Sequence, residues 1–86
     1  MSEPAPTLQP LEYYLDGIYE VEIIEEYLPV SETTIYLARL KNAPRCSAQG
    51  STAQQALDRL QHIKEVMIKS RHERGVVPPE PDHQRE

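Results

Sequence analysis

The chain has 86 residues and a formal net charge of −5 at pH 7. This length suits one small domain with a limited core, and the single cysteine, Cys46, excludes an internal disulfide. No apolar run approaches the roughly 20 residues that cross a bilayer, and the N-terminus lacks the basic start of a signal peptide. We therefore expect a cytoplasmic protein with no membrane partner.

The charged residues are unevenly distributed along the chain. Residues 39–86 hold nine Lys or Arg against six carboxylates, whereas residues 1–38 hold eight carboxylates and no Lys or Arg. An acidic half repels phosphate, so we expect no nucleic-acid partner. Such a half would suit a basic protein, but charges on a solvated strand also serve to discourage edge-to-edge aggregation. The eight carboxylates are Glu3, Glu12, Asp16, Glu20, Glu22, Glu25, Glu26 and Glu32.

The two ends of the chain are rich in proline and lack a periodic apolar pattern, which is typical of disordered or extended segments. We expect a disordered N-terminal tail at residues 1–11 and a Pro-rich C-terminal tail at residues 76–86. The folded domain then occupies residues 12–75.

Three strands are predicted in the first half of this domain. Residues 19–28 begin with strict alternation of apolar and acidic side chains, which indicates a half-buried strand. The second strand, residues 33–40, is rich in β-branched and aromatic residues, and a short third strand follows at residues 45–49. Short connections between the three favour an antiparallel sheet. Residues 11–15 could add an edge strand or a turn.

A strand-to-helix junction follows the third strand. We expect Gly50 to take a positive φ in the turn. The hydroxyl of Ser51 or Thr52 is placed to cap the first helical turn, while Gln54 or Gln55 can reach back to the N–H of the cap residue. The junction therefore predicts a helix that begins close to Thr52.

The predicted helix runs from about Thr52 to Glu73, because its apolar residues recur at three- and four-residue spacing. Gly75 and the prolines that follow it end the helix. The resulting fold class is α+β, a two-layer β-β-β-α domain with a three-stranded antiparallel sheet on one long helix. Its expected core comprises Val21, Ile23, Leu57, Leu60, Ile63 and Met67, with Tyr36, Ala38, Cys46 and Ala48.

One helix covers one sheet face, so the opposite face would leave Ile24, Ile35 and Leu37 wet. The two sheet edges would also carry unpaired backbone groups. We therefore expect a homodimer, formed along a sheet edge or through the helix.

Six short segments of residues 18–81 stand in a recognisable order: Tyr19–Val21, Tyr36–Ala38, Pro44–Cys46, Ala48–Thr52, Gln54–Leu57 and Gly75–Pro79. In this order and spacing, the chain resembles the HicB-type antitoxins, which are partners of HicA messenger-RNA-cleaving toxins. Four positions depart from the family pattern. Arg45 replaces a glycine of the family pattern, Ser51 replaces an aspartate, and Gln54-Gln55 replace paired glutamates.

The resemblance implies a HicB-like, partial ribonuclease H-like fold. It also implies a non-catalytic protein that neutralises a small, basic HicA-like toxin by contact between proteins. The alternative is a stand-alone oligomeric scaffold or regulatory binding domain with no toxin partner. HicB antitoxins usually continue into a DNA-binding domain, whereas the sequence ends at Glu86, so operator binding is not carried over from the resemblance.

No set of side chains with catalytic spacing is found. A ribonuclease H-like site needs several carboxylates around magnesium, but alternation alone explains Glu20 and Glu22, with Asp16 nearby in sequence. Cys46 fits a small buried hydrophobe better than a nucleophile. We expect no enzyme activity, no catalytic, metal or cofactor site, and no cofactor. The partner-binding residues cannot be assigned from the sequence.

The remaining polar candidates are three histidines and a basic patch. His62, His72 and His83 have no Asp or Cys at ligand spacing, so we interpret them as surface residues. The basic patch lacks interleaved aromatic residues for stacking on RNA bases, and the helix dipole accounts for cations near the helix end. It comprises Lys64, Lys69, Arg71 and Arg74.

Overall fold

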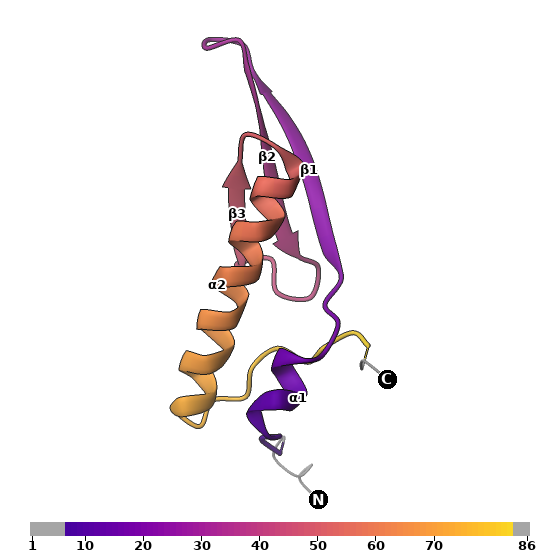
Figure 1. Cartoon of the computed structure of the whole chain (residues 1–86), viewed down its shortest axis with the longest axis vertical. Helices are drawn as coiled ribbons and strands as arrows, with labels where there is room; N and C mark the ends of the chain where they lie inside the picture. The colour runs from indigo at the N-terminus through magenta and orange to yellow at the C-terminus, as the bar shows by residue number, and fades with distance from the viewer. Residues whose placement is uncertain (1–6, 84–86) are drawn as a thin grey trace, which may run out of the picture.

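The computed structural model describes residues 7–83. Its elements are α1 (Leu11–Leu15), β1 (Val21–Leu28), β2 (Thr33–Leu40), β3 (Ser47–Gly50) and α2 (Ala53–Glu73). The strands form an antiparallel sheet in the order β1-β2-β3, and α2 packs along β2 and β3 (Figure 1). The expected α+β fold, with a three-stranded antiparallel sheet followed by a long helix, is confirmed.

The first element is a helix, not the edge strand or turn expected for residues 11–15. Helix α1 begins after Pro10, whose ring fixes φ at −56° at the N-cap position. Leu11, Tyr14 and Leu15 are three and four residues apart, so they share one helical face. Tyr14 is completely buried. The short helix therefore contributes an aromatic side chain to the core that the sequence pattern did not predict.

Helix α2 covers only part of the sheet. In the β1–β2 register, Val21 pairs with Leu40 and Ile23 pairs with Ala38. Leu40 and Ala38 are buried, whereas Ile23 is 44% exposed. Helix α2 packs against β2 and β3, and β1 is the edge strand on the other side of β2 from β3, so Ile23 lies beside the covering helix rather than beneath it. The β1–β2 hairpin also extends well beyond the N-terminal end of α2 (Figure 1). The strand state of β1 was predicted correctly, but the expected alternation of burial is not found at Glu22, which is partly buried, and the expected core position of Ile23 is wrong.

The buried line of α2 also differs from the expected one. It repeats at every fourth residue: Ala56, Leu60, Lys64 and Ile68. Leu60 is in the core as predicted, and Leu57 and Met67 pack against it while partly buried. Ile63 is 40% exposed, so its expected core position is wrong, and Ile68, which is fully buried, takes its place.

The β3–α2 junction has the predicted hydroxyl cap at Thr52, but the side chain of Gln55 reaches the N–H of Ser51, one residue before the cap, rather than that of Thr52 itself. Thr52 Oγ1 accepts a hydrogen bond from the Gln55 backbone N–H at 3.0 Å, and Gln55 Oε1 accepts one from the Ser51 N–H at 2.7 Å. Gly50 does not have the expected positive φ. A Cβ at this position would instead lie 2.6 Å from the Ala56 nitrogen. Glycine is required here because the strand and the helix approach each other closely.

Residues 76–83, which we call the C-terminal segment, return from the end of α2 toward α1 and the start of β1 (Figure 1). The Tyr19 hydroxyl donates to the Pro79 carbonyl at 2.8 Å. The Asp82 N–H donates to the Ile18 carbonyl at 2.9 Å. The segment is extended, and these bonds hold it against the domain.

The expected tails are only partly within the described residues: 1–6 and 84–86 lie outside them. Before α1, the Gln9 carbonyl oxygen lies 2.8 Å from His72 Nε2, and Leu8 packs against the core. With the C-terminal segment, these contacts extend the packed domain beyond the expected limits of 12–75. In the part of the chain that the structure describes, no helix has the length and apolar character needed to cross a membrane.

Candidate functional site

The three carboxylates considered for metal chemistry do not form one cluster. Glu22 Oε2 accepts from Arg39 Nε at 2.9 Å, in a partly exposed ion pair across β1 and β2. Glu20 precedes β1, and its oxygens lie 3.7 Å from His83 Nε2 and 4.0 Å from Lys41 Nζ. Asp16 is exposed at the C-cap of α1. Among residues 7–83, no group of three or more His, Cys, Asp or Glu is arranged to hold a metal ion.

The three histidines have different surroundings. His62 is exposed on α2, and His83 is exposed beside Glu20. His72 is half-buried rather than a surface residue, because its ring packs edge-on against Tyr14 and its Nε2 reaches the Gln9 carbonyl. The structure therefore corrects the expected surface position for His72 and gives it a packing role between α2, α1 and the residues before α1.

Cys46 and Lys64 lie in the interior. Cys46 is buried as predicted, and burial raises the pKa of its thiol, an effect that the charges of Lys64 and Arg71 oppose. Burial lowers the pKa of the Lys64 ammonium, which lies 5.1 Å from the centroid of the Tyr19 ring. Because Lys64 is only 9% exposed, it does not belong to the expected surface basic patch.

One exposed surface runs along the edge strand β1 from Ile23 to the tip of the β1–β2 hairpin. Tyr27 is 58% exposed and Val30 is fully exposed. The hairpin carries four acids, Glu22, Glu25, Glu26 and Glu32, and its one cation, Arg39, is paired with Glu22. Among residues 7–83, β1 has a neighbouring strand in the sheet on one side only, and the outer backbone groups of such an edge strand can pair with another chain. We call this the hairpin surface, formed by the exposed residues Ile23, Glu25, Glu26, Tyr27, Val30 and Glu32.

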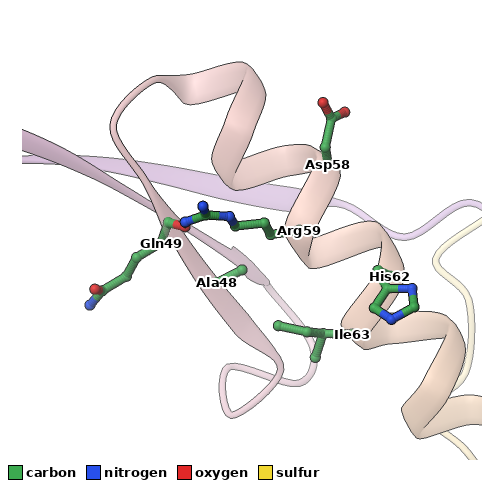
Figure 2. Close-up of a pocket in the computed structure, with 6 residues that line it drawn as sticks. All are labelled: Ala48, Gln49, Asp58, Arg59, His62 and Ile63. Carbon is green, nitrogen blue, oxygen red and sulfur yellow. The ribbon is translucent and has the colours of Figure 1, made fainter.

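A second surface is a groove of about 460 Å³ between β3 and α2. Arg59 Nη1 donates to the Gln49 carbonyl at 2.9 Å across this groove (Figure 2). Ile63 also lines a smaller hollow of about 150 Å³ farther along α2, which Cys46 and Met67 share. The larger groove is lined by Ala48, Gln49, Asp58, Arg59, His62 and Ile63.

The apolar patch expected on the uncovered sheet face is present but is partly buried. Ile24 pairs directly with Leu37 in the register, and Ile35 lies two residues from Leu37 on the same face. All three side chains have intermediate exposure. Neighbouring side chains therefore shield this face more than they shield the hairpin surface or the groove.

The sequence pattern missed both surfaces for one reason. Apolar periodicity finds the residues that are suited to a core, but it does not show where the covering element stops. Ile23 and Ile63 both fit the core pattern and both are exposed. The apolar residues Ala56, Leu60 and Ile68 are spaced by multiples of four. This spacing was the available signal that a different face of the helix, rotated slightly from the expected one, faces the sheet.

The chain was also compared with known proteins. No protein-family model, curated protein or solved structure gives a significant match.

Proposed function

We propose that the chain is a non-catalytic protein-binding domain of the antitoxin type. In this proposal it neutralises a small, basic, HicA-like messenger-RNA-cleaving toxin through contact between proteins. The observation that carries the proposal is the hairpin surface, where exposed apolar and acidic side chains occur together on a strand that has a free edge.

The chemistry of the hairpin surface suits a basic protein. Tyr27 and Val30 provide apolar area that is open to solvent, and aromatic residues are favoured anchors at protein interfaces. Glu25 and Glu26 add negative charge along the same strand, which would attract a lysine-rich partner and speed its association. The free backbone of β1 could in addition pair with a strand of the partner.

The positions of the polar side chains support a non-catalytic role. Glu22 is paired with Arg39, and Glu20 lies beside Lys41. The Cys46 thiol is buried, and its pKa is raised by burial, so little of the reactive thiolate forms at neutral pH. The two glutamates are held in ion pairs and the thiol lies in the core, so these groups are not gathered around one point where a substrate could react.

The test is binding of the whole chain to the purified product of a neighbouring gene, one that encodes a small lysine-rich protein. We expect a complex by titration calorimetry, with an affinity that falls as salt is raised, because charge attraction is screened. The same chain should restore growth to cells that express that protein as a toxin.

Paired variants locate the contact. Glu25→Lys and Glu26→Lys should each weaken the complex, whereas Glu12→Lys, a matched charge reversal at an exposed position of α1, should leave it unchanged. Equal effects of all three would count against the hairpin surface as the binding site.

A stand-alone oligomeric scaffold is the second candidate. The observation in its favour is the exposed apolar part of α2, where Ile63 and Val66 are open to solvent and lie away from the hairpin surface. If no neighbouring small basic protein binds the chain, this candidate replaces the antitoxin role.

A further inference from the structure

A row of exposed residues runs along α2, and its N-terminal half borders the groove beside β3. Its members are spaced alternately by four and three residues, which is the spacing of the seam along which two helices pair. We call this row the α2 seam. It comprises Arg59, Ile63, Val66, Ser70 and Glu73, all of them exposed.

The centre of the α2 seam is apolar. Ile63 is 40% exposed and Val66 is 54% exposed, although both lie in the middle of a 21-residue helix. Neither belongs to the buried line of α2, since Leu60 and Lys64 face the sheet instead. Two neighbouring apolar residues on the solvent side of a helix are typical of a surface that another element covers.

The ends of the α2 seam carry opposite charges. These charges favour a second copy of the chain as the partner, with its helix running in the opposite direction. Arg59 lies toward the N-terminal end and Glu73 at the C-terminal end. We propose that two copies of the chain pair through this seam with their α2 helices antiparallel, around a two-fold axis near Val66. Each Arg59 then faces Glu73 of the second copy, whereas parallel helices would bring like charges together.

The residues beside Arg59 and Glu73 also meet opposite charges in the antiparallel arrangement. Asp58 precedes Arg59 and Arg74 follows Glu73, so the antiparallel arrangement also brings Asp58 close to Arg74 of the second copy. Arg59 already donates one hydrogen bond to the Gln49 carbonyl. Its guanidinium carries five N–H donors, so it retains others for a carboxylate of the second copy.

The groove beside β3 enlarges the contact. A pair of helices alone buries less than the roughly 1,200 Å² that stable interfaces usually bury. Ile63 lies at the edge of the 460 Å³ groove, next to Ala48 (Figure 2). Side chains from α2 of the second copy can enter this groove and add area on the β3 side. The pairing leaves the hairpin surface open, so it is independent of the proposed function.

The first test is the mass of the whole chain in solution. We expect light scattering at micromolar concentration to give twice the 9.9 kDa of one chain. Val66→Lys should return the protein to a monomer, because two lysines would meet at the two-fold axis. Gln61→Lys places the same residue at an exposed position outside the seam and should leave the dimer intact. Far-UV circular dichroism verifies that both variants fold.

The second test is a charge exchange that identifies the direction of the helices. Arg59→Glu and Glu73→Arg should each raise the dissociation constant about tenfold. The double variant should recover the parent value, since the opposite charges are restored. A parent chain that is monomeric, a dimer that tolerates Val66→Lys, or a double variant without recovery would each overturn the proposal.

Discussion

The Lys64 ammonium lies over the face of the Tyr19 ring, 5.1 Å from its centroid, and both side chains are buried. The ring provides a weak electrostatic partner for the cation. Burial nevertheless lowers the pKa of Lys64, and burial is also the main reason that the pKa of Tyr19 is raised. The buried surroundings of Lys64 therefore disfavour its charged form.

Lys64→Met should raise the free energy of unfolding at neutral pH by about 1 kcal/mol, because methionine keeps the apolar stem and removes the buried charge. The pKa of Lys64 is lower in the folded protein than in the unfolded chain. The penalty is thus complete below the folded pKa and disappears as the pH rises toward the unfolded value. Urea unfolding at pH 7 and pH 10 should show the advantage of the variant shrinking. A less stable variant would mean that the contact with Tyr19 outweighs the cost of burial.

Leu60→Ala should cost about 2–5 kcal/mol, since Leu60 is almost completely buried between α2 and the sheet. Ile63→Ala is the matched control on the same helix, and it should cost much less because Ile63 is 40% exposed. Thermal unfolding of both variants at a concentration where the chain is monomeric provides the comparison. Equal losses of stability in the two variants would show that α2 is rotated so that Ile63 is as buried as Leu60.

Gly17→Ala should displace the C-terminal segment. A Cβ at Gly17 would lie 2.3 Å from Pro81 Cγ, so the segment must move, at a cost of about 1–3 kcal/mol. The Asp82 and His83 amides, which donate to the Ile18 carbonyl, should then exchange faster with solvent. Gly75→Ala is the control: it has open space but a φ of 73°, so it should lower stability by about 1 kcal/mol without releasing those amides. Unchanged exchange in Gly17→Ala would contradict the tight packing of the segment.

Purified chain should leave RNA intact with and without magnesium, because Glu20 and Glu22 each lie beside a cation. Gel analysis of a labelled RNA is the measurement. Cleavage that is lost on Glu20→Ala or Glu22→Ala would revive a ribonuclease H-like activity.

The parts that the sequence predicted correctly depend on local chemistry. The bounds of β2, the antiparallel pairing and the Thr52 cap follow from residues within a few positions of one another. The helical state of residues 11–15 was missed because one helical turn is too short for a clear periodic pattern, and because Pro10 lies at the N-cap rather than at the first helical position, where proline is favoured. Lys64 was placed on the surface because lysine is rarely buried. Its partner Tyr19 is distant in sequence, so no local pattern could have indicated the contact.

The overhang of the β1–β2 hairpin beyond α2 divides the molecule into regions of unequal local stability. The half of the sheet beside α2 shares the core, whereas the strands near Tyr27 and Thr34 are held mainly by their own ladder. Such a region opens at a fraction of the global free energy of unfolding. The tip could therefore adjust its backbone to fit a bound protein while α1, α2 and the C-terminal segment keep their positions.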